Sequence, residues 1–137
     1  MAKLTLDALH DLAVGVLCAS RTSPENAAAA AQALVAAEAD GLAGHGASRL
    51  PAYADQAVAG KVDGFATPGL SETAAAAVRV DARNGFAYPA IALGLDHAAR
   101  MVEKTGVVAV AVGNSHHFGA AGYHVERLAE KGFLGLA

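Results

Sequence analysis

Apolar and polar residues follow a helical period through the first sixty positions of the chain. Between residues 7 and 19, apolar side chains recur three and four positions apart, which predicts a helix with one apolar face. A second helix is predicted to begin after Ser23, a suitable N-cap, and to end at Gly41. A third is predicted over residues 49–59 and ends at Gly60. The N-terminal part is therefore predicted to be helical.

The second half of the chain mixes strand and helix patterns. Residues 61–69 (KVDGFATPG) are rich in turn formers and predict an irregular connection. Residues 76–82 (AAVRVDA) alternate as in a strand, and the Asn84-Gly85 pair that follows is a strong turn signal. A helix is predicted from Pro89 to Thr105, and residues 106–112 (GVVAVAV) are typical of a strand buried on both faces. Strand, helix and strand in this order predict a parallel βαβ unit.

Two more elements are predicted at the end of the chain. Residues 119–131 predict a helix, and residues 132–137 (GFLGLA) predict the start of another strand. The predicted fold is α/β, with a helical N-terminal subdomain over residues 1–62 and the beginning of an α/β domain over residues 63–137. A strand at Ala137 would have little sheet beyond it. We therefore expect either an edge strand or a fragment that is incomplete at the C-terminus.

Composition narrows the class of protein. Apolar residues make up 54% of the 137 residues, which argues against a disordered chain. The net charge is −3 and no basic stripe is present, so we expect no nucleic-acid partner. No apolar run approaches the roughly 20 residues of a membrane-spanning helix. The single cysteine, Cys18, excludes a disulfide within the chain. We therefore expect a cytoplasmic protein without a membrane partner.

Two adjacent histidines stand in the segment NSHHFGAAG, residues 114–122. In the βαβ interpretation this segment leaves the carboxyl end of a strand, where open α/β sheets bind ligands. His116 and His117 therefore lie where a site is expected, and histidine titrates near neutral pH, which suits proton exchange with a carbonyl or alcohol oxygen. From the residues alone, hydrogen bonds to the loop backbone explain the pair equally well.

A second candidate segment is DGLAGHGASRLPAY, residues 40–53. His45 lies between two glycines, which permit close backbone approach. Arg49 carries a guanidinium group that suits a substrate carboxylate. From the residues alone, a surface arginine in a loop between helices is the better interpretation.

Motifs for cofactors and metals are incomplete. Gly113, Gly119 and Gly122 fit neither the G-x-G-x-x-G pattern nor the P-loop, so the residues give no sign of a Rossmann site. A small histidine metalloprotein is an alternative, but no H-x-x-x-H or cysteine pair supports it and no metal ligand is assigned. The histidines available to such a site are His45, His116, His117 and His124.

Three segments together resemble the malate/L-lactate dehydrogenase family of NAD(P)-dependent oxidoreductases. They are DGLAGHGASRLPAYADQAVAGKVDG, VRVDARNGFAYPAIALG and GNSHHFGAAGYHVERLAEKGFLGLA. The family includes malate, sulfolactate, ureidoglycolate and diketogulonate dehydrogenases and Δ1-piperideine-2-carboxylate reductases. The resemblance covers the N-terminal part of these proteins. It implies a non-Rossmann nucleotide-binding fold, a homodimer, NAD or NADP as cofactor and a small carboxylate substrate.

The resemblance also assigns roles to residues. The family's loop reads Ser-His-Gly with an arginine four residues after the histidine; His45, Gly46 and Arg49 match it, and Gly44 replaces the serine. By the same resemblance His117 is the proton-transfer residue, Arg49 holds the substrate carboxylate, and His45 and His116 line the substrate pocket. Most cofactor-binding residues of the family lie beyond the position that matches Ala137.

The function expected from this resemblance is hydride transfer between a nicotinamide and a small 2-hydroxy acid, 2-oxo acid or cyclic imino acid. The chain would be the N-terminal portion of such an oxidoreductase. Two alternatives remain open: a non-catalytic truncated product that at most associates with a partner, and the small histidine metalloprotein. A genuine short protein also remains an alternative to a fragment.

Overall fold

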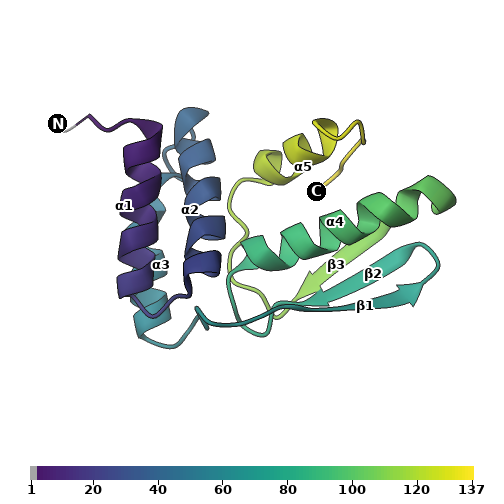
Figure 1. The fold of residues 1–137 in the computed structure, drawn as a ribbon, viewed down its shortest axis with the longest axis horizontal. Coiled ribbons are helices and arrows are strands. Elements are labelled where there is room, and N and C mark those ends of the chain that lie inside the picture. Colours follow the sequence, from purple (N-terminus) through teal and green to yellow (C-terminus); the bar gives the residue numbers. More distant parts are fainter. Residues whose placement is uncertain (1–2) are drawn as a thin grey trace. The chain divides into compact units, whose positions relative to one another are not determined.

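The computed structural model describes residues 3–137, and backbone contacts divide the chain into two compact units, one up to Phe65 and one from Ala66 onward. The helices and strands are labelled in Figure 1. In chain order they are α1 (Leu6–Ala19), α2 (Pro24–Ala39), the 3₁₀ helix η1 (Ala47–Arg49), α3 (Leu50–Val58), β1 (Gly69–Ala74), β2 (Ala77–Asp81), α4 (Ala87–Thr105), β3 (Ala109–Gly113) and α5 (Ala121–Ala129). None of the helices described is long and apolar enough to cross a membrane.

The first unit is helical, and α1 packs against both α2 and α3. The Ser23 hydroxyl caps α2 by accepting a hydrogen bond from the Asn26 N–H at 3.3 Å. The core of the unit includes many alanines of α2, whose small side chains let neighbouring helices approach closely. The three predicted helices, with Ser23 as a cap, are confirmed. The buried alanines of α2 are Ala27, Ala30, Ala31, Ala33 and Ala37.

Replacing Gly15 with alanine should stabilise the first unit. Gly15 lies in the interior of α1, and a Cβ built there has no neighbouring atom within 4 Å. The substitution should raise the free energy of unfolding by about 0.5–1 kcal/mol, because glycine loses more backbone entropy in a helix than alanine does. Urea denaturation measures the change. Gly60→Ala is the matched control: its Cβ also has open space, but its φ of +75° should make that substitution destabilising. A Gly15→Ala variant no more stable than the parent would contradict the prediction.

The second unit is built on a three-stranded sheet in the order β1-β2-β3. Strands β1 and β2 pair antiparallel, whereas β2 and β3 pair in parallel and are joined by the long helix α4 (Figure 1). The predicted βαβ unit is therefore confirmed. Its core contains Val78 and Val80 of β2 and Ala90 of α4. At Gly94 a Cβ would lie only 2.7 Å from a methyl group of Val110, so the glycine lets α4 lie close to the sheet.

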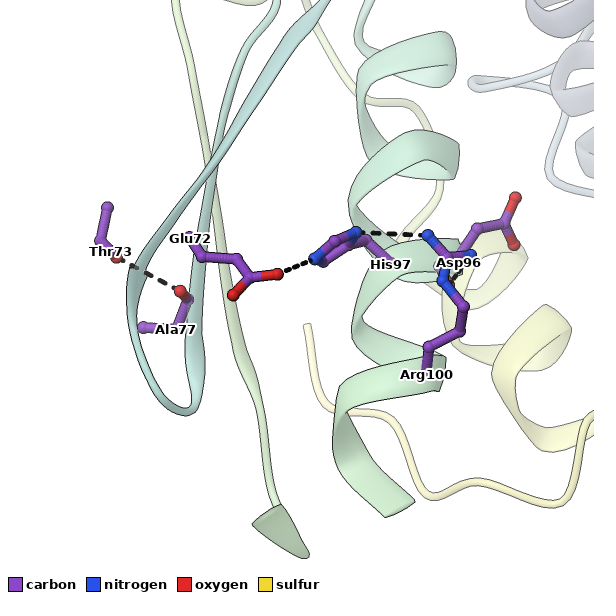
Figure 2. Close-up of polar contacts among 6 residues, drawn as sticks. All are labelled: Glu72, Thr73, Ala77, Asp96, His97 and Arg100. Atoms are coloured by element: carbon purple, nitrogen blue, oxygen red, sulfur yellow. Dashed lines mark hydrogen bonds and ion pairs between the residues drawn. The ribbon is translucent and has the colours of Figure 1, made fainter. Parts of the chain in front are cut away.

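Polar side chains connect β1 to α4 on the exposed side of the second unit (Figure 2). His97 Nε2 lies 2.7 Å from Glu72 Oε1, and Arg100 Nη2 lies 3.2 Å from His97 Nδ1. Arginine can only donate, so Nδ1 of His97 accepts and the ring proton resides on Nε2, which donates to Glu72. The three side chains therefore form one chain of hydrogen bonds from strand to helix.

The structure differs from the sequence predictions at three places in the second unit. The sequence did not indicate β1, because its residues from Ser71 to Ala74 are all exposed and give no apolar alternation. The expectation that β3 is buried on both faces was wrong: Ala109 and Ala111 are exposed, and the valines between and after them are half-buried.

The predicted final strand is also absent from the described structure. Residues 133–137 have no strand pairing, and Leu134 and Leu136 are 89% and 93% exposed. Phe133 N–H instead donates to the Leu128 carbonyl at 3.0 Å and closes the end of α5. An apolar run indicates a strand only where a partner strand satisfies its backbone.

Candidate active site

The first candidate loop begins where α2 ends. Gly41 adopts a left-handed conformation with a φ of +74°, which reverses the chain after the helix. Its N–H donates to the Glu38 carbonyl at 3.1 Å, and the Leu42 N–H donates to the Ala37 carbonyl at 2.8 Å. These two bonds satisfy carbonyls at the end of the helix. The prediction that Gly41 ends this helix is confirmed.

Glu38 fixes the next part of this loop. Its carboxylate accepts a hydrogen bond from the Ala47 N–H at 2.9 Å. Gly46 is buried, and a Cβ at this position would overlap the Glu38 carboxylate, so no other residue fits without a shift. The neighbouring His45 is half-buried, and its N–H donates to the Leu42 carbonyl at 2.7 Å. The conformation around His45 is thus set by a residue, Glu38, that the sequence did not single out.

Arg49 lies at the end of η1 with an exposed side chain. Its Nε donates to the Gly44 carbonyl at 2.6 Å, which orients the guanidinium within its own loop. Among the ion pairs of residues 3–137, none joins Arg49 to a carboxylate. Its guanidinium can therefore form an ion pair with an anionic ligand. A Cβ at Gly44 would meet nothing within 4 Å, so a serine would fit there without a clash.

In the second unit, the loops that follow β2 and β3 lie side by side at the carboxyl ends of these parallel strands. Backbone hydrogen bonds join them at three points, and the last of these holds the N–H of His116. The connection that leads to the histidine pair is therefore fixed by the turn after β2. The bonds are Ala82 N–H to the Gly113 carbonyl at 3.0 Å, Asn84 N–H to the Asn114 carbonyl at 2.7 Å and His116 N–H to the Gly85 carbonyl at 3.0 Å.

Asp81 joins the same two loops through its side chain. It accepts hydrogen bonds from the Arg83 N–H at 2.8 Å and from Asn114 Nδ2 at 3.1 Å. The hydrogen bond from the Arg83 N–H is the main cause of a lowered pKa of Asp81, and the bond from Asn114 adds to it. Both bonds favour the carboxylate form. Arg83, Asn84 and Asn114 all have positive φ, and the Gly85 N–H donates to the Ala82 carbonyl, which makes a tight turn. The turn predicted around Asn84-Gly85 is confirmed.

The two histidines have different surroundings. His116 is half-buried, and its ring meets the Phe86 ring edge-on at 5.7 Å between centroids. His117 is exposed, and its Nδ1 accepts a hydrogen bond from the Gly119 N–H at 3.2 Å. A neutral His117 therefore carries its proton on Nε2. The side chain of His117 is therefore more accessible to a ligand than that of His116.

Two buried side chains, His124 and Tyr88, pack beside the loop of His117. His124, in the first turns of α5, is 5% exposed, and its Nε2 lies 2.8 Å from the Phe118 carbonyl. The rings of Tyr88 and His124 stack at 6.0 Å. Burial is the main cause of a lowered pKa of His124, which favours the neutral ring. Sequence reasoning considered His124 only as a metal ligand and did not single out Tyr88.

Comparison with known proteins decides the family. Residues 4–137 match the family described as malate/L-lactate dehydrogenase. The chain belongs to the malate/L-lactate dehydrogenase family. The resemblance inferred from the three sequence segments is thus confirmed.

Relatives in the malate/L-lactate dehydrogenase family are longer than this chain. It is 48% identical over 134 residues to the (2R)-3-sulfolactate dehydrogenase (NADP(+)) of Chromohalobacter salexigens, covering 98% of this chain and 40% of that protein. It is 32% identical to the ureidoglycolate dehydrogenase (NAD(+)) of Escherichia coli K12, covering 98% of this chain and 39% of that protein. The chain thus spans about 40% of the length of these relatives.

A solved structure supports the mixed helix and sheet fold of the family. The crystal structure of Δ1-piperideine-2-carboxylate reductase from Pseudomonas syringae matches this chain with a TM-score of 0.91 and 38% sequence identity. The match covers 96% of this chain and 40% of that protein.

The glycines of the histidine loop have different surroundings. Gly119 is needed for packing, because a Cβ there would lie 2.6 Å from the Tyr88 hydroxyl, and its φ is +75°. A Cβ built at Gly113 or at Gly122 would meet no atom within 4 Å, so both positions border open space. Within residues 3–137, no three His, Cys, Asp or Glu side chains gather to hold a metal ion. We therefore assign no metal ligand among the described residues.

The four residues predicted for the site fall into two pairs. His45 and Arg49 belong to the first unit, where they share one loop. His116 and His117 belong to the second unit, where they follow β3. Each pair is held by contacts within its own unit.

Proposed function

We propose that this chain contributes substrate-handling residues to an NAD(P)-dependent oxidoreductase. The reaction is hydride transfer between a nicotinamide and C2 of a small 2-hydroxy acid, 2-oxo acid or cyclic imino acid. Family membership supports this, since the relatives named above are dehydrogenases and a reductase. The observation that carries the proposal is the exposed His117 at the carboxyl end of β3, where α/β sheets bind ligands.

His117 is the proton-transfer residue of this proposal. With both ring nitrogens protonated, His117 can give its Nε2 proton to the substrate oxygen or nitrogen that becomes protonated on reduction, and the ring is left neutral. Protonation of Nδ1 breaks the hydrogen bond that this nitrogen accepts from the Gly119 N–H. In the oxidation direction the neutral ring, with its proton on Nδ1, accepts the substrate proton at Nε2. His116 lines the substrate pocket beside it.

Arg49 holds the substrate carboxylate, and His45 lines the substrate pocket from the same loop. The Nε bond to Gly44 limits the rotation of the guanidinium, which lowers the entropic cost of forming two parallel bonds to a carboxylate. We further propose a homodimer in the cytoplasm, a nucleotide-binding fold other than the Rossmann fold, and a division into a helical subdomain over residues 1–62 and an α/β domain from residue 63.

A substrate panel tests the proposal. The full-length product of the gene that encodes this chain is assayed by absorbance at the nicotinamide band. The panel contains malate, lactate, sulfolactate, ureidoglycolate and Δ1-piperideine-2-carboxylate, each with both cofactors in the appropriate redox state. Turnover of at least one of these compounds is expected. Binding of neither cofactor and turnover of none would reject the proposal.

Replacing Arg49 with lysine should weaken substrate binding in the full-length gene product. Lysine keeps the positive charge but loses both the planar fork and the Nε bond to Gly44. Loss of one charged hydrogen bond should raise KM by roughly 10- to 100-fold, with a smaller change in kcat. Arg79→Lys, at an exposed position of β2, is the control and should leave KM unchanged. Equal KM values for both variants would remove Arg49 from carboxylate binding.

A further inference from the structure

We infer that Glu38 is a positioning residue that orients the guanidinium of Arg49 for carboxylate binding. The inference rests on the carboxylate-binding role proposed for Arg49. Glu38 lies in the last turn of α2, and its Oε2 accepts a hydrogen bond from the Ala47 N–H at 2.9 Å. Ala47 is the first residue of η1 and Arg49 is the last. A side chain of the preceding helix therefore holds the short helix that carries the arginine.

Glu38 binds both ends of the loop that joins α2 to η1. At the beginning of the loop, its backbone carbonyl accepts a hydrogen bond from the Gly41 N–H at 3.1 Å. At the end of the loop, its carboxylate accepts from the Ala47 N–H. The two ends of the segment 41–46 are therefore brought together at one residue of α2.

The carboxylate of Glu38 also caps η1. The first N–H groups of a helix have no partner within the helix, and the side chain of the residue just before it commonly accepts from one of them. Gly46 stands at that position in η1 and has no side chain to do so. Glu38 accepts from the first N–H instead, and a carboxylate is a stronger acceptor than a neutral oxygen. The start of η1 is therefore fixed to α2.

The orientation of Arg49 depends on how η1 lies over this loop. A Cβ at Gly46 would lie 3.1 Å from both Cα and Cβ of Glu38, so the backbone before η1 packs directly on the glutamate. The Arg49 N–H donates to the Gly46 carbonyl at 3.0 Å, and the Arg49 Nε donates to the Gly44 carbonyl at 2.6 Å. Both bonds need η1 folded back over residues 41–46. Because Glu38 holds η1 there, it sets the direction of the guanidinium.

Two matched variants of this chain, Glu38→Gln and Glu38→Met, test the positioning. Both side chains resemble glutamate in length and helix propensity, but only glutamine keeps an oxygen that can accept from the Ala47 N–H. Amide hydrogen exchange at Ala47, measured by NMR, should be slow in the parent and in the glutamine variant. It should be roughly tenfold faster in the methionine variant. The Arg49 Nε–H resonance should keep its parent position in the glutamine variant and move toward that of a free arginine side chain in the methionine variant.

Kinetics of the full-length gene product connect this positioning to substrate binding. Glu38→Met should raise KM roughly tenfold with little change in kcat. Glu38→Gln should raise KM only about twofold, because its neutral oxygen still accepts, although more weakly than a carboxylate. In an Arg49→Lys background, Glu38→Met should raise KM no further, because the fork that Glu38 orients is already lost. A residue that only stabilised the fold would have the same effect in both backgrounds.

Three results would overturn the inference. One is an Ala47 amide that exchanges at the unprotected rate in the parent chain, a measurement that needs no variant. The second is the same Arg49 Nε–H resonance in the glutamine and methionine variants. The third, where Arg49→Lys itself raises KM, is a KM that Glu38→Met changes equally, or not at all, in both backgrounds. If Arg49→Lys leaves KM unchanged while the Nε–H resonance still differs between the two Glu38 variants, the positioning stands and the proposed role of Arg49 is rejected.

Discussion

Replacing His117 with alanine should lower the kcat of the full-length gene product by roughly 10²- to 10⁴-fold, the usual contribution of a positioned general acid or base. His117 is exposed in the loop that follows β3, where α/β sheets bind ligands. Steady-state kinetics with the substrate found in the panel measures the loss. Cofactor affinity, measured by NAD(P)H fluorescence, should stay the same, because no cofactor contact is assigned to this side chain.

Two further variants separate proton transfer from simple hydrogen bonding. His117→Gln keeps a donor near Nε2 but cannot exchange a proton at neutral pH, so it should be as slow as the alanine variant. His10→Ala, on α1, removes a histidine that lies beside Asp11 and should leave kcat unchanged. A glutamine variant close to the parent in kcat would show that His117 only donates a hydrogen bond, and an alanine variant close to the parent would remove it from the reaction.

The elements with strong local signals were predicted correctly from the sequence. α2 has a cap at Ser23, a proline in its first turn and a left-handed glycine at its end, and the structure uses all three. The βαβ unit followed from two short apolar runs around an amphipathic helix. β1 gave no such signal, because its side chains from Ser71 onward face solvent and its stability comes from pairing with β2. The final apolar run gave a false signal, because local pattern carries no information about a partner strand.

The sequence named candidate reacting residues, but it did not single out the residues that hold them in place. Arg49 and His117 were named by resemblance to a family, which the comparisons confirm, while their catalytic roles remain proposals. The residues that hold them act across sequence gaps that no local pattern reveals. Glu38 fixes Ala47 from the preceding helix, Asp81 binds Asn114 33 positions away, and Tyr88 packs on His124. Such contacts depend on how the chain folds back on itself.

At Gly64 two backbone segments of the first unit approach each other so closely that a side chain would not fit between them. Its backbone passes beside the segment that leads into α2, and a bridge pairs it with Thr22. A Cβ at this position would lie 2.3 Å from the Arg21 carbonyl oxygen and 2.7 Å from the Thr22 Cα. Its own carbonyl accepts hydrogen bonds from Asn26 Nδ2 at 2.9 Å and from the Ser23 N–H at 3.0 Å. Backbone atoms cannot move aside as the end of a flexible side chain can, so relief of the clash must displace this carbonyl.

Gly64→Ala should therefore lower the free energy of unfolding by about 3 kcal/mol, since it combines overpacking with loss of hydrogen bonds to partly buried donors. Urea denaturation of this chain, followed by circular dichroism, measures the loss as a lower midpoint. Gly44→Ala is the matched control: it lies in a loop of the same unit, its Cβ would meet nothing within 4 Å, and it should change stability by less than about 0.5 kcal/mol. If the two alanine variants unfold at the same urea concentration, the approach of Gly64 to Thr22 does not constrain the fold. A large loss at Gly64 alone would show that the entry to α2 depends on a residue 38 positions beyond Asn26.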